Sequence, residues 1–264
     1  MPWLFAHRGT STLAPENTIA AFEIARSARA EVLEIDVRIS HDRQIIVTHD
    51  ASVVRTTNGT GLVAKQTIDE LKTLDAGYCF TTPEKETPWR GQDLKLITLS
   101  ELFQAFPEIG INIDIKDSHP EAATIIAEEL RKLSDGRWVN VGSFHQKTIN
   151  AFRQHAPEIS TAAARLDVAA LFFGRKLPTR LCQSLCEKSG GQVLQIPERW
   201  GGLALDSARF IDYIHQQNRL VMYWTINDPD NMLTLLNRGA NGIVSDNVVV
   251  AREIIDQFIA QRSM

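Results

Sequence analysis

The sequence predicts a single (β/α)8 barrel, and three observations support this fold class. Apolar segments of strand length alternate with helical patterns along the whole chain, which is typical of a parallel sheet covered by helices. Eight of these segments have the spacing of parallel strands. The chain has 264 residues, 44% of them hydrophobic, a size that suits one barrel better than two small domains. We therefore expect one domain over residues 1–264.

The predicted elements follow one another in a regular order. The strands are expected at Trp3–Ala6, Val32–Val37, Ile111–Lys116, Trp138–Ser143, Ile159–Ala163, Val193–Ile196, Leu220–Thr225 and Gly242–Ser245. The helices are expected at Thr18–Ala28, Leu99–Phe106, Pro120–Leu133, Lys147–His155, Val168–Phe173, Thr179–Lys188, Ser207–Gln217, Pro229–Arg238 and Val249–Gln261. Asn17 and Asp228 precede two of these helices as expected capping residues.

A ninth extended segment, Gln44–Thr48, follows the second strand too closely to be parallel to it. A parallel crossover needs about a dozen residues or more, so this segment is expected to fold back as a hairpin. With Asp42 and Arg43 as a two-residue turn, Asp36 would face His49. The hairpin would therefore bring a histidine to the end of a strand that carries carboxylates.

The stretch from Asp50 to Leu99 contains glycine, threonine, proline and charged clusters, with one short helical pattern at Thr67–Leu74. A segment of this length without a core of its own usually has a function or is mobile. We expect a cap inserted above the barrel at about residues 50–98.

Charge and cysteine content restrict the class of partner. The net charge of −4, from 28 basic and 32 acidic side chains, gives no basic excess for nucleic acid or an acidic membrane, so a bound anion should be small. Cys79, Cys182 and Cys186 lack the spacing of a disulfide framework or zinc knuckle.

The N-terminus lacks a signal-peptide pattern, and the longest apolar run, Val168–Phe173, is too short to span a bilayer. We expect a cytoplasmic protein without membrane insertion, whose oligomeric state the sequence leaves open.

Charged side chains enter two strands that should be buried on both faces. Glu34 and Asp36 lie two residues apart and share one face, and Asn112, Asp114 and Lys116 repeat this arrangement. Buried carboxylates are unfavourable unless they are paired or hold a cation, and an all-oxygen cluster suits Mg²⁺ or Ca²⁺. Glu34, Asp36 and Asp114 are therefore predicted metal ligands. In the alternative interpretation, Lys116 pairs with one acid and the others are hydrated.

His7 and Arg8 follow the first strand, at the end of a barrel where active-site loops are found. The forked donors of arginine match phosphate oxygens, and Gly9 would let the backbone approach them. His49 lies at a second predicted strand end. Two histidines, three carboxylates, an arginine and a lysine are together typical of a phosphodiester site.

Nine short motifs occur in a fixed order along nearly the whole chain. They are His-Arg-Gly (7–9), Ala-Pro-Glu-Asn-Thr (14–18), Glu-Ile-Asp-Val (34–37), His-Asp (49–50), Arg-Thr-Thr-Asn-Gly-Thr-Gly (55–61), Asn-Ile-Asp-Ile-Lys (112–116), Ser-Phe (143–144), Trp-Thr-Ile-Asn (224–227) and Gly-Ile-Val-Ser-Asp (242–246). Their order and spacing resemble the glycerophosphodiester phosphodiesterase family. This resemblance implies metal-dependent hydrolysis of glycerophosphodiesters to sn-glycerol 3-phosphate and an alcohol.

The resemblance also implies roles for individual residues. It assigns one divalent ion, Mg²⁺ or Ca²⁺ with Mn²⁺ as a further option, to the three predicted metal ligands. It makes His7 and His49 the general acid and base, and it makes Arg8 and Lys116 the phosphate ligands. The chain departs from the family at Asp114, where glutamate is usual, and at residues 97–99, where Ile-Thr-Leu replaces Ile-Pro-Thr-Leu. The shorter carboxylate of Asp114 could change the affinity for the metal or its identity.

Three further residues have weaker signals for the substrate pocket. Glu16 would either approach the phosphate site, as a partner of Arg8, or belong to the start of a helix. Trp224 would wall the glycerol pocket or pack inside the barrel. Phe144 is expected to line the core more than the substrate. Asp246 is expected to support the end of the last strand.

Several alternatives remain open on sequence grounds. The two histidines could act on opposite sides of phosphorus, through a cyclic phosphate or by direct attack of water, and either one could be the acid. A lysophospholipase D activity would use the same site on lipids that keep one acyl chain. A non-catalytic binding barrel and a zinc hydrolase, which would want more histidine ligands, are the other rivals. The preferred alcohol group is open, and the inserted cap is expected to select it.

Overall fold

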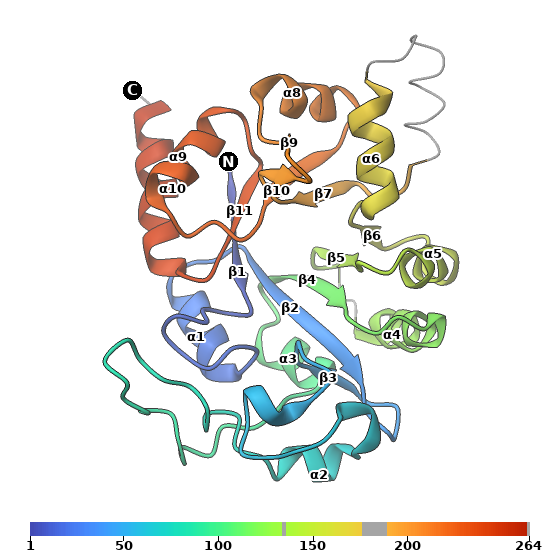
Figure 1. Cartoon of the computed structure of the whole chain (residues 1–264), viewed down its shortest axis with the longest axis vertical. Coiled ribbons are helices and arrows are strands. Elements are labelled where there is room, and N and C mark those ends of the chain that lie inside the picture. The colour runs from blue at the N-terminus through green and yellow to red at the C-terminus, as the bar shows by residue number, and fades with distance from the viewer. Residues whose placement is uncertain (134–135, 176–188, 263–264) are drawn as a thin grey trace.

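The computed structural model describes residues 1–133, 136–175 and 189–262. Within these residues, eight parallel strands form a barrel in the order β6-β5-β4-β2-β1-β11-β10-β7 (Figure 1). A parallel bridge from Ala162 to Val193 joins the two ends of this order. The predicted barrel is therefore confirmed. The strands are β1 (Trp3–His7), β2 (Val32–Ile39), β4 (Gly110–Ile115), β5 (Val139–Gly142), β6 (Ser160–Thr161), β7 (Val193–Ile196), β10 (Leu220–Tyr223) and β11 (Gly242–Ser245).

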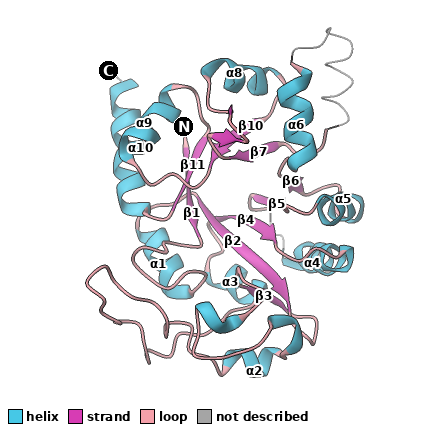
Figure 2. Ribbon diagram, in the orientation of Figure 1, coloured by secondary structure: helices cyan, strands magenta, loops and turns pink. Residues whose placement is uncertain are grey.

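Helices surround the barrel on the outside (Figure 2). They are α1 (Ile19–Ser27), α3 (Leu99–Ala105), α4 (Pro120–Leu133), α5 (Gln146–His155), α6 (Arg165–Gly174), α8 (Ala208–Gln216), α9 (Pro229–Asn237) and α10 (Val248–Arg262). The cap of α1 is Thr18, whose side chain accepts a hydrogen bond from the Ala21 amide, and not Asn17 as predicted. Asp228 caps α9 as expected. The predicted helix Thr179–Lys188, Cys182 and Cys186 lie outside the described residues.

The strands separate apolar from charged side chains by their two-residue period. Leu33, Ile35 and Val37 of β2 are fully buried in the core between the barrel and the helices, together with residues 111, 113 and 115 of β4. Glu34 and Asp36 alternate with them and face the inside of the barrel. The two-faced pattern predicted for these strands is therefore confirmed.

Aromatic side chains fill the interior of the barrel toward the N-terminal ends of the strands. The rings of Trp3 and Trp138 lie edge to face with centroids 5.1 Å apart, and Phe5 lies 5.8 Å from Trp138. These bulky rings close this part of the barrel by packing. The polar side chains of the same strands therefore gather toward the C-terminal ends, where a barrel carries its active-site loops.

Glu31 ties β1 to the last helix. Its Oε2 accepts a hydrogen bond from the Leu4 amide at 2.7 Å, and its Oε1 lies 2.8 Å from Nη1 of Arg252. Arg252 is buried and also pairs with Asp256 at 3.1 Å. The pair therefore fixes α10 against the first strand.

Replacing Arg252 by methionine is expected to lower the free energy of unfolding by about 1–2 kcal/mol. Methionine keeps much of the apolar stem, but Glu31 loses its cation and Asp256 keeps only Arg29, and partial exposure of both acids limits the loss. Urea unfolding measures the effect. Arg29→Met is the matched control, because Arg29 is largely exposed and pairs with the same Asp256; its expected loss is below about 0.5 kcal/mol. Equal losses in the two variants would contradict the prediction.

The hairpin after β2 forms, but its predicted register is wrong. Strand β3 (Ile45–Val47) pairs antiparallel with β2, with Val37 opposite Val47 and Ile39 opposite Ile45, which is one residue away from the expected pairing. The Ser40 amide donates to the Gln44 carbonyl at 2.9 Å, which leaves residues 41–43 as the loop, and Arg43 adopts a left-handed φ of 64°. A three-residue loop that ends in this conformation is a common hairpin connection, whereas the predicted two-residue turn would usually need two such residues.

The inserted segment (residues 50–98) has a small core, contrary to expectation. It contains η1 (Val53–Arg55), η2 (Val63–Lys65) and α2 (Ile68–Lys72) and lies beside the β2–β3 hairpin and α1 (Figure 1). Buried side chains of the segment pack together against Ile46 of β3. They are Val53, Val63, Leu71, Ala76 and Leu96.

A second short hairpin was not predicted. Strands β8 (Arg199–Trp200) and β9 (Leu203–Ala204) pair antiparallel around Gly201 and Gly202, whose φ angles are 52° and 82°. Two glycines with positive φ are typical of a two-residue hairpin turn, so the Gly-Gly pair between two apolar residues was the available signal.

Among the described helices, none is both long enough and apolar enough to cross a membrane.

Candidate active site

A cavity of about 360 Å³ opens at the C-terminal ends of the barrel strands. It brings together nine of the ten residues predicted from sequence, from segments far apart in the chain. Glu16 is the exception, because it does not line the cavity but contacts Arg8 behind it, with Oε1 3.0 Å from Nη1. The nine are His7, Arg8, Glu34, Asp36, His49, Asp114, Lys116, Phe144 and Trp224.

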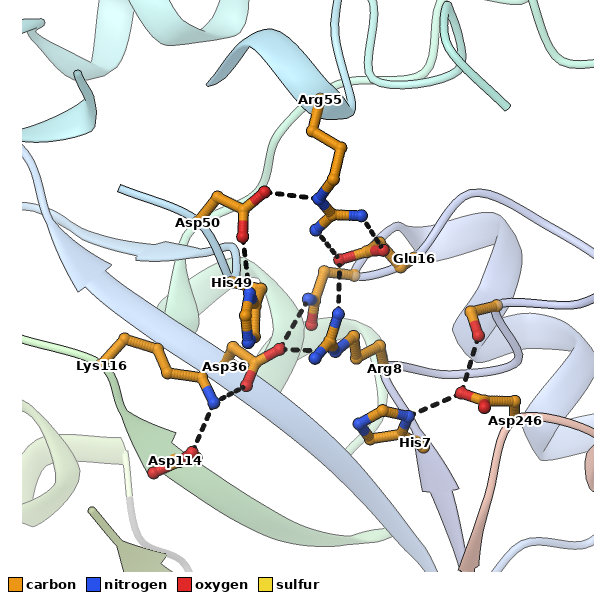
Figure 3. A network of polar contacts seen from close by, with 12 residues as sticks. His7, Arg8, Glu16, Asp36, His49, Asp50, Arg55, Asp114, Lys116 and Asp246 are labelled. Carbon is orange, nitrogen blue, oxygen red and sulfur yellow. Dashed lines mark hydrogen bonds and ion pairs between the residues drawn. The ribbon is translucent and has the colours of Figure 1, made fainter. Parts of the chain in front are cut away.

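Two cations flank Asp36 at the centre of the site (Figure 3). Its Oδ1 lies 2.9 Å from Nζ of Lys116, and its Oδ2 lies 2.9 Å from Nε of Arg8. The side chain is only 1% exposed. Burial opposes its ionisation, but Lys116 and Arg8 outweigh it and hold the pKa of Asp36 below its ordinary value. Asp36 is therefore a charged carboxylate that orients both basic residues.

Glu34 and Asp114 are less well compensated than Asp36. Burial, together with the neighbouring charge of Asp36, raises the pKa of Glu34 to about 7. Burial also raises the pKa of Asp114, although Lys116 lies 2.5 Å from its Oδ2. Strands β2 and β4 place Asp36 directly beside Asp114, so three acids share a small volume. Additional positive charge there would favour the ionised forms of Glu34 and Asp114.

These acids fit a hard divalent cation by their chemistry. In the parts of the chain that the structure describes, no three His, Cys, Asp or Glu side chains converge as they stand closely enough to hold an ion. Lys116 instead bridges Asp36 and Asp114, much as in the alternative interpretation of the sequence. The three acids nevertheless present carboxylate oxygens to one cavity, and two of these acids, Glu34 and Asp114, have raised pKa values. A set of carboxylate oxygens suits Mg²⁺ or Ca²⁺.

Asp246 is a side-chain partner of His7. Nδ1 of His7 lies 2.6 Å from Oδ1 of Asp246, whose carboxylate also accepts hydrogen bonds from Ser11 and Asn227, both at 2.8 Å. Burial opposes ionisation of Asp246, but these hydrogen bonds lower its pKa to about 2. The carboxylate can only accept, so Nδ1 carries the proton and Nε2 is left for the cavity.

The role of Asp246 follows from closure of the barrel. Strand β1 pairs with β11, with Ala6 beside Ser245, so His7 and Asp246 extend from neighbouring strand ends. From the sequence, Asp246 was expected only to support the end of its own strand. The signal was present, because the first and last strands of a closed eight-stranded barrel are neighbours.

His49 is held in a similar way by the adjacent acid. Its Nδ1 lies 2.7 Å from Oδ1 of Asp50, as Figure 3 shows. Asp50 is paired in turn with Arg55 of η1. Asp50 and Arg55 both belong to motifs of the sequence, but no role was predicted for either. Each candidate acid–base histidine therefore has a carboxylate on Nδ1.

The backbone at His-Arg-Gly makes a tight turn. Arg8 has a φ of 53°, and its amide donates to the Glu34 carbonyl at 2.9 Å. Gly9 has a φ of 90°, and a Cβ there would lie 2.6 Å from the Ala21 Cβ. A larger residue at position 9 would therefore collide with α1. The positive φ and the packing against α1 both require glycine at position 9, in addition to the approach to a phosphate that was expected from the sequence.

The cavity has a charged side and an apolar side. Most of the charged residues lie on or directly after β1, β2, β3 and β4, with Arg165 of α6 as the exception, while the ends of β5, β6, β7 and β10 supply mainly apolar ones. Phe144 is 50% exposed at the cavity and packs edge to face on Trp224, with centroids 5.8 Å apart, so the expectation that it lines the core is wrong. Further apolar residues that line the cavity were not predicted from the sequence: Ala162, Ala163, Val168, Ile196, Pro197, Trp200 and Leu205.

Comparisons with known proteins show the family to which this chain belongs. The model of the glycerophosphoryl diester phosphodiesterase family matches residues 7–250. The Bacillus subtilis protein YhdW is 33% identical over 252 residues, which cover 92% of this chain and 94% of YhdW. A glycerophosphodiester phosphodiesterase of Bacillus altitudinis is 28% identical, with 93% and 95% covered. The structure of an Oleispira antarctica phosphodiesterase in complex with its product sn-glycerol 3-phosphate has a TM-score of 0.75 and 26% identity, with 97% of each chain covered. The chain therefore belongs to the glycerophosphoryl diester phosphodiesterase family.

Proposed function

We propose that this enzyme hydrolyses glycerophosphodiesters to sn-glycerol 3-phosphate and an alcohol, with His7 and His49 as the acid–base pair and a divalent cation bound by Glu34, Asp36 and Asp114. Membership of the family makes the chain a glycerophosphodiester phosphodiesterase. The proposal concerns its residues and its metal. One observation supports it most: two carboxylate-bound imidazoles and two basic side chains face the same cavity as the three acids.

The basic residues suit the phosphate of the substrate. A phosphodiester is an anion, so its hydrolysis needs positive charge where negative charge builds up on the phosphoryl oxygens. Arg8 and Lys116 line the cavity, and Asp36 orients both of them. We assign the phosphoryl oxygens to these two side chains.

The three acids suit the metal. When bound, a divalent cation neutralises developing charge and lowers the pKa of a coordinated hydroxyl. Glu34 and Asp114, whose pKa values are raised, gain most from such an ion. Asp36 contributes to the ligand set and also aligns Arg8 and Lys116.

The two histidines suit proton transfer. Asp246 keeps the proton of His7 on Nδ1, so Nε2 can exchange a proton with a substrate oxygen. Asp50 gives His49 the same arrangement. A pair with this geometry serves attack by a glycerol hydroxyl, through a cyclic phosphate, as well as direct attack by water. The Oleispira protein, which is bound to sn-glycerol 3-phosphate, supports the product assigned here.

Replacing Asp246 by asparagine is expected to lower kcat by about 10²- to 10⁴-fold. The amide of asparagine can donate to Nδ1, which would move the proton of His7 to Nε2 and so disable it as a base. Steady-state hydrolysis of glycerophosphocholine measures the effect. Asp230→Asn, at the exposed start of α9, serves as the control and should leave kcat within about twofold. Equal kcat values for the two variants would exclude this role of Asp246.

The central test is an assay of several glycerophosphodiesters against Mg²⁺, Ca²⁺ and Mn²⁺. We expect release of sn-glycerol 3-phosphate that stops in chelator and returns with at least one of the metals. Full activity in chelator would remove the metal from the proposal. Failure to hydrolyse any of the substrates with any metal would favour the non-catalytic barrel instead.

The apolar side of the cavity favours a second candidate, a lysophospholipase D activity. An acyl chain retained on the glycerol could lie against Val168, Trp200 and Leu205, which line the cavity. Release of lysophosphatidic acid from lysophosphatidylcholine, compared with release of sn-glycerol 3-phosphate from glycerophosphocholine, decides between the substrates. A higher kcat/KM for the lysophospholipid would make it the preferred one.

A further inference from the structure

A continuous series of ion pairs connects His49 with Arg8 through the inserted segment (Figure 3). Asp50 binds His49 through Oδ1 at 2.7 Å and pairs through Oδ2 with Nε of Arg55. The other end of the Arg55 guanidinium meets both oxygens of Glu16, at 2.7 and 2.8 Å. Glu16 then binds Nη1 of Arg8 at 3.0 Å. Arg55 is therefore the central member of the series.

We propose that Arg55 is a positioning residue for two groups at once, His49 through Asp50 and Arg8 through Glu16. The inference rests on the proposed function, which assigns proton transfer to His49 and phosphate binding to Arg8. Arg55 is absent from the described lining of the cavity, so its effect passes through the two acids.

The shape of the guanidinium explains why this position holds arginine. Its planar fork presents donors in fixed directions, with Nε toward Asp50 and the two Nη atoms toward Glu16. A lysine ammonium is a compact charge without this fork, so it would satisfy one acid well and the other poorly. Arg55→Lys is therefore expected to preserve one branch of the series at most.

Contacts of the η1 backbone hold the main chain of Arg55 in place. Val53 is buried in the small core of the inserted segment, and the Thr57 hydroxyl donates to its carbonyl at 2.8 Å. The Val53 amide in turn donates to the Gly61 carbonyl at 3.1 Å. The inserted segment thus contributes to the site an arginine whose backbone is held by packing and hydrogen bonds.

Loss of Arg55 should affect the two branches differently. Asp50 would lose its second partner and could rotate away from His49, which lowers kcat. Glu16 would be left with Arg8 as its cation and would compete more strongly with a phosphate for it, which raises KM. A simultaneous change in both parameters is therefore the expected pattern.

The test compares Arg55→Met with a matched control, Arg131→Met. The two arginines have almost the same side-chain exposure, 49% and 48%, and Arg131 pairs with Glu158 at 2.8 Å away from the site. With glycerophosphocholine, Arg55→Met should lower kcat/KM by about 10- to 100-fold, with Arg55→Lys between it and the unsubstituted enzyme. Arg131→Met should stay within about twofold. The thermal midpoint of Arg55→Met should stay above the assay temperature, so that the loss of kcat/KM is measured on folded enzyme.

A second comparison separates positioning from direct action. If Arg55 acts through its two acids, then Arg55→Met adds no further loss to a variant that already carries Asp50→Asn and Glu16→Gln. Losses that multiply, or an Arg55→Met enzyme within twofold of the unsubstituted one, would overturn the inference.

Calorimetric binding of sn-glycerol 3-phosphate keeps this inference separate from the proposed function. If the unsubstituted protein hydrolyses no glycerophosphodiester, the proposed function is contradicted. The Arg8 branch would still predict about tenfold weaker binding by Arg55→Met and unchanged binding by Arg131→Met. Equal binding by both variants would overturn the inference even then.

Discussion

Alanine at either His7 or His49 is expected to lower turnover of glycerophosphodiesters by about 10²- to 10⁴-fold, which is the usual contribution of a general acid or base. Each variant loses an imidazole that transfers a proton and whose orientation is set by a carboxylate, Asp246 for His7 and Asp50 for His49. The double variant should be much less impaired than the product of the two single losses implies, because groups that act as a unit are not additive.

The measurement is kcat for each variant at saturating substrate and metal. His119→Ala is a suitable control, because His119 is exposed and lies outside the cavity lining. Near-normal turnover in His7→Ala or in His49→Ala would remove that histidine from the mechanism. The pH dependence of the surviving activity would then identify the group that replaces it.

Replacing Glu34 by glutamine is expected to inactivate the enzyme while it stabilises the metal-free protein at alkaline pH. Burial raises the pKa of Glu34 from 4.5 to about 7, so the folded protein holds a proton that the unfolded chain has released. Stability is therefore lost as the pH rises from about 4.5 to 7, by about 3–4 kcal/mol in total, and the loss stays nearly constant above pH 7. Glutamine removes this penalty but also removes a proposed metal ligand.

Urea unfolding in chelator at pH 5 and at pH 8 tests this prediction. The variant should gain stability relative to the unsubstituted protein only at the higher pH. Adding Mg²⁺ or Ca²⁺ should then stabilise the unsubstituted protein but not Glu34→Gln, since a ligand stabilises the state that binds it. Turnover should fall by at least about 10²-fold, because loss of supporting groups around a metal already costs about 10–100-fold.

The control for this prediction is Glu128→Gln, at an exposed position of α4. Its stability relative to the unsubstituted protein should be the same at pH 5 and pH 8. A Glu34→Gln variant that is no more stable than the unsubstituted protein at pH 8 would contradict the burial argument. Equal stabilisation of both proteins by the metal would instead remove Glu34 from the ligand set.

Much of the fold could be predicted because its signals are local. All eight parallel strands lie where apolar segments of strand length predicted them, and the period of two placed Glu34 and Asp36 on the inner face. The hairpin register could not be predicted in the same way. It depends on Arg43 adopting a left-handed φ, which only a few residues favour strongly enough to be read from sequence.

Contacts between segments that are distant in the sequence were not predicted. Asp246 binds His7 across 239 positions of sequence, and Trp200 reaches the cavity because β8 and β9 form a hairpin. Phe144 likewise lines the cavity beside Trp224, which follows another strand and packs on its ring. Each contact requires a closed barrel and a particular side-chain direction, so a strand pattern alone does not specify it.

The sequence by itself determined which chemical groups this enzyme has and which face of each strand carries them. Alternation and spacing are properties of the chain, and they put acids, histidines and basic residues at strand ends before any contact is known. Only the tertiary structure decided the pairing: Lys116 lies between Asp36 and Asp114, and Arg55 lies between Asp50 and Glu16. The physical reason is that a charged side chain selects its partner by distance and burial, and both are set when separate strands and loops pack together.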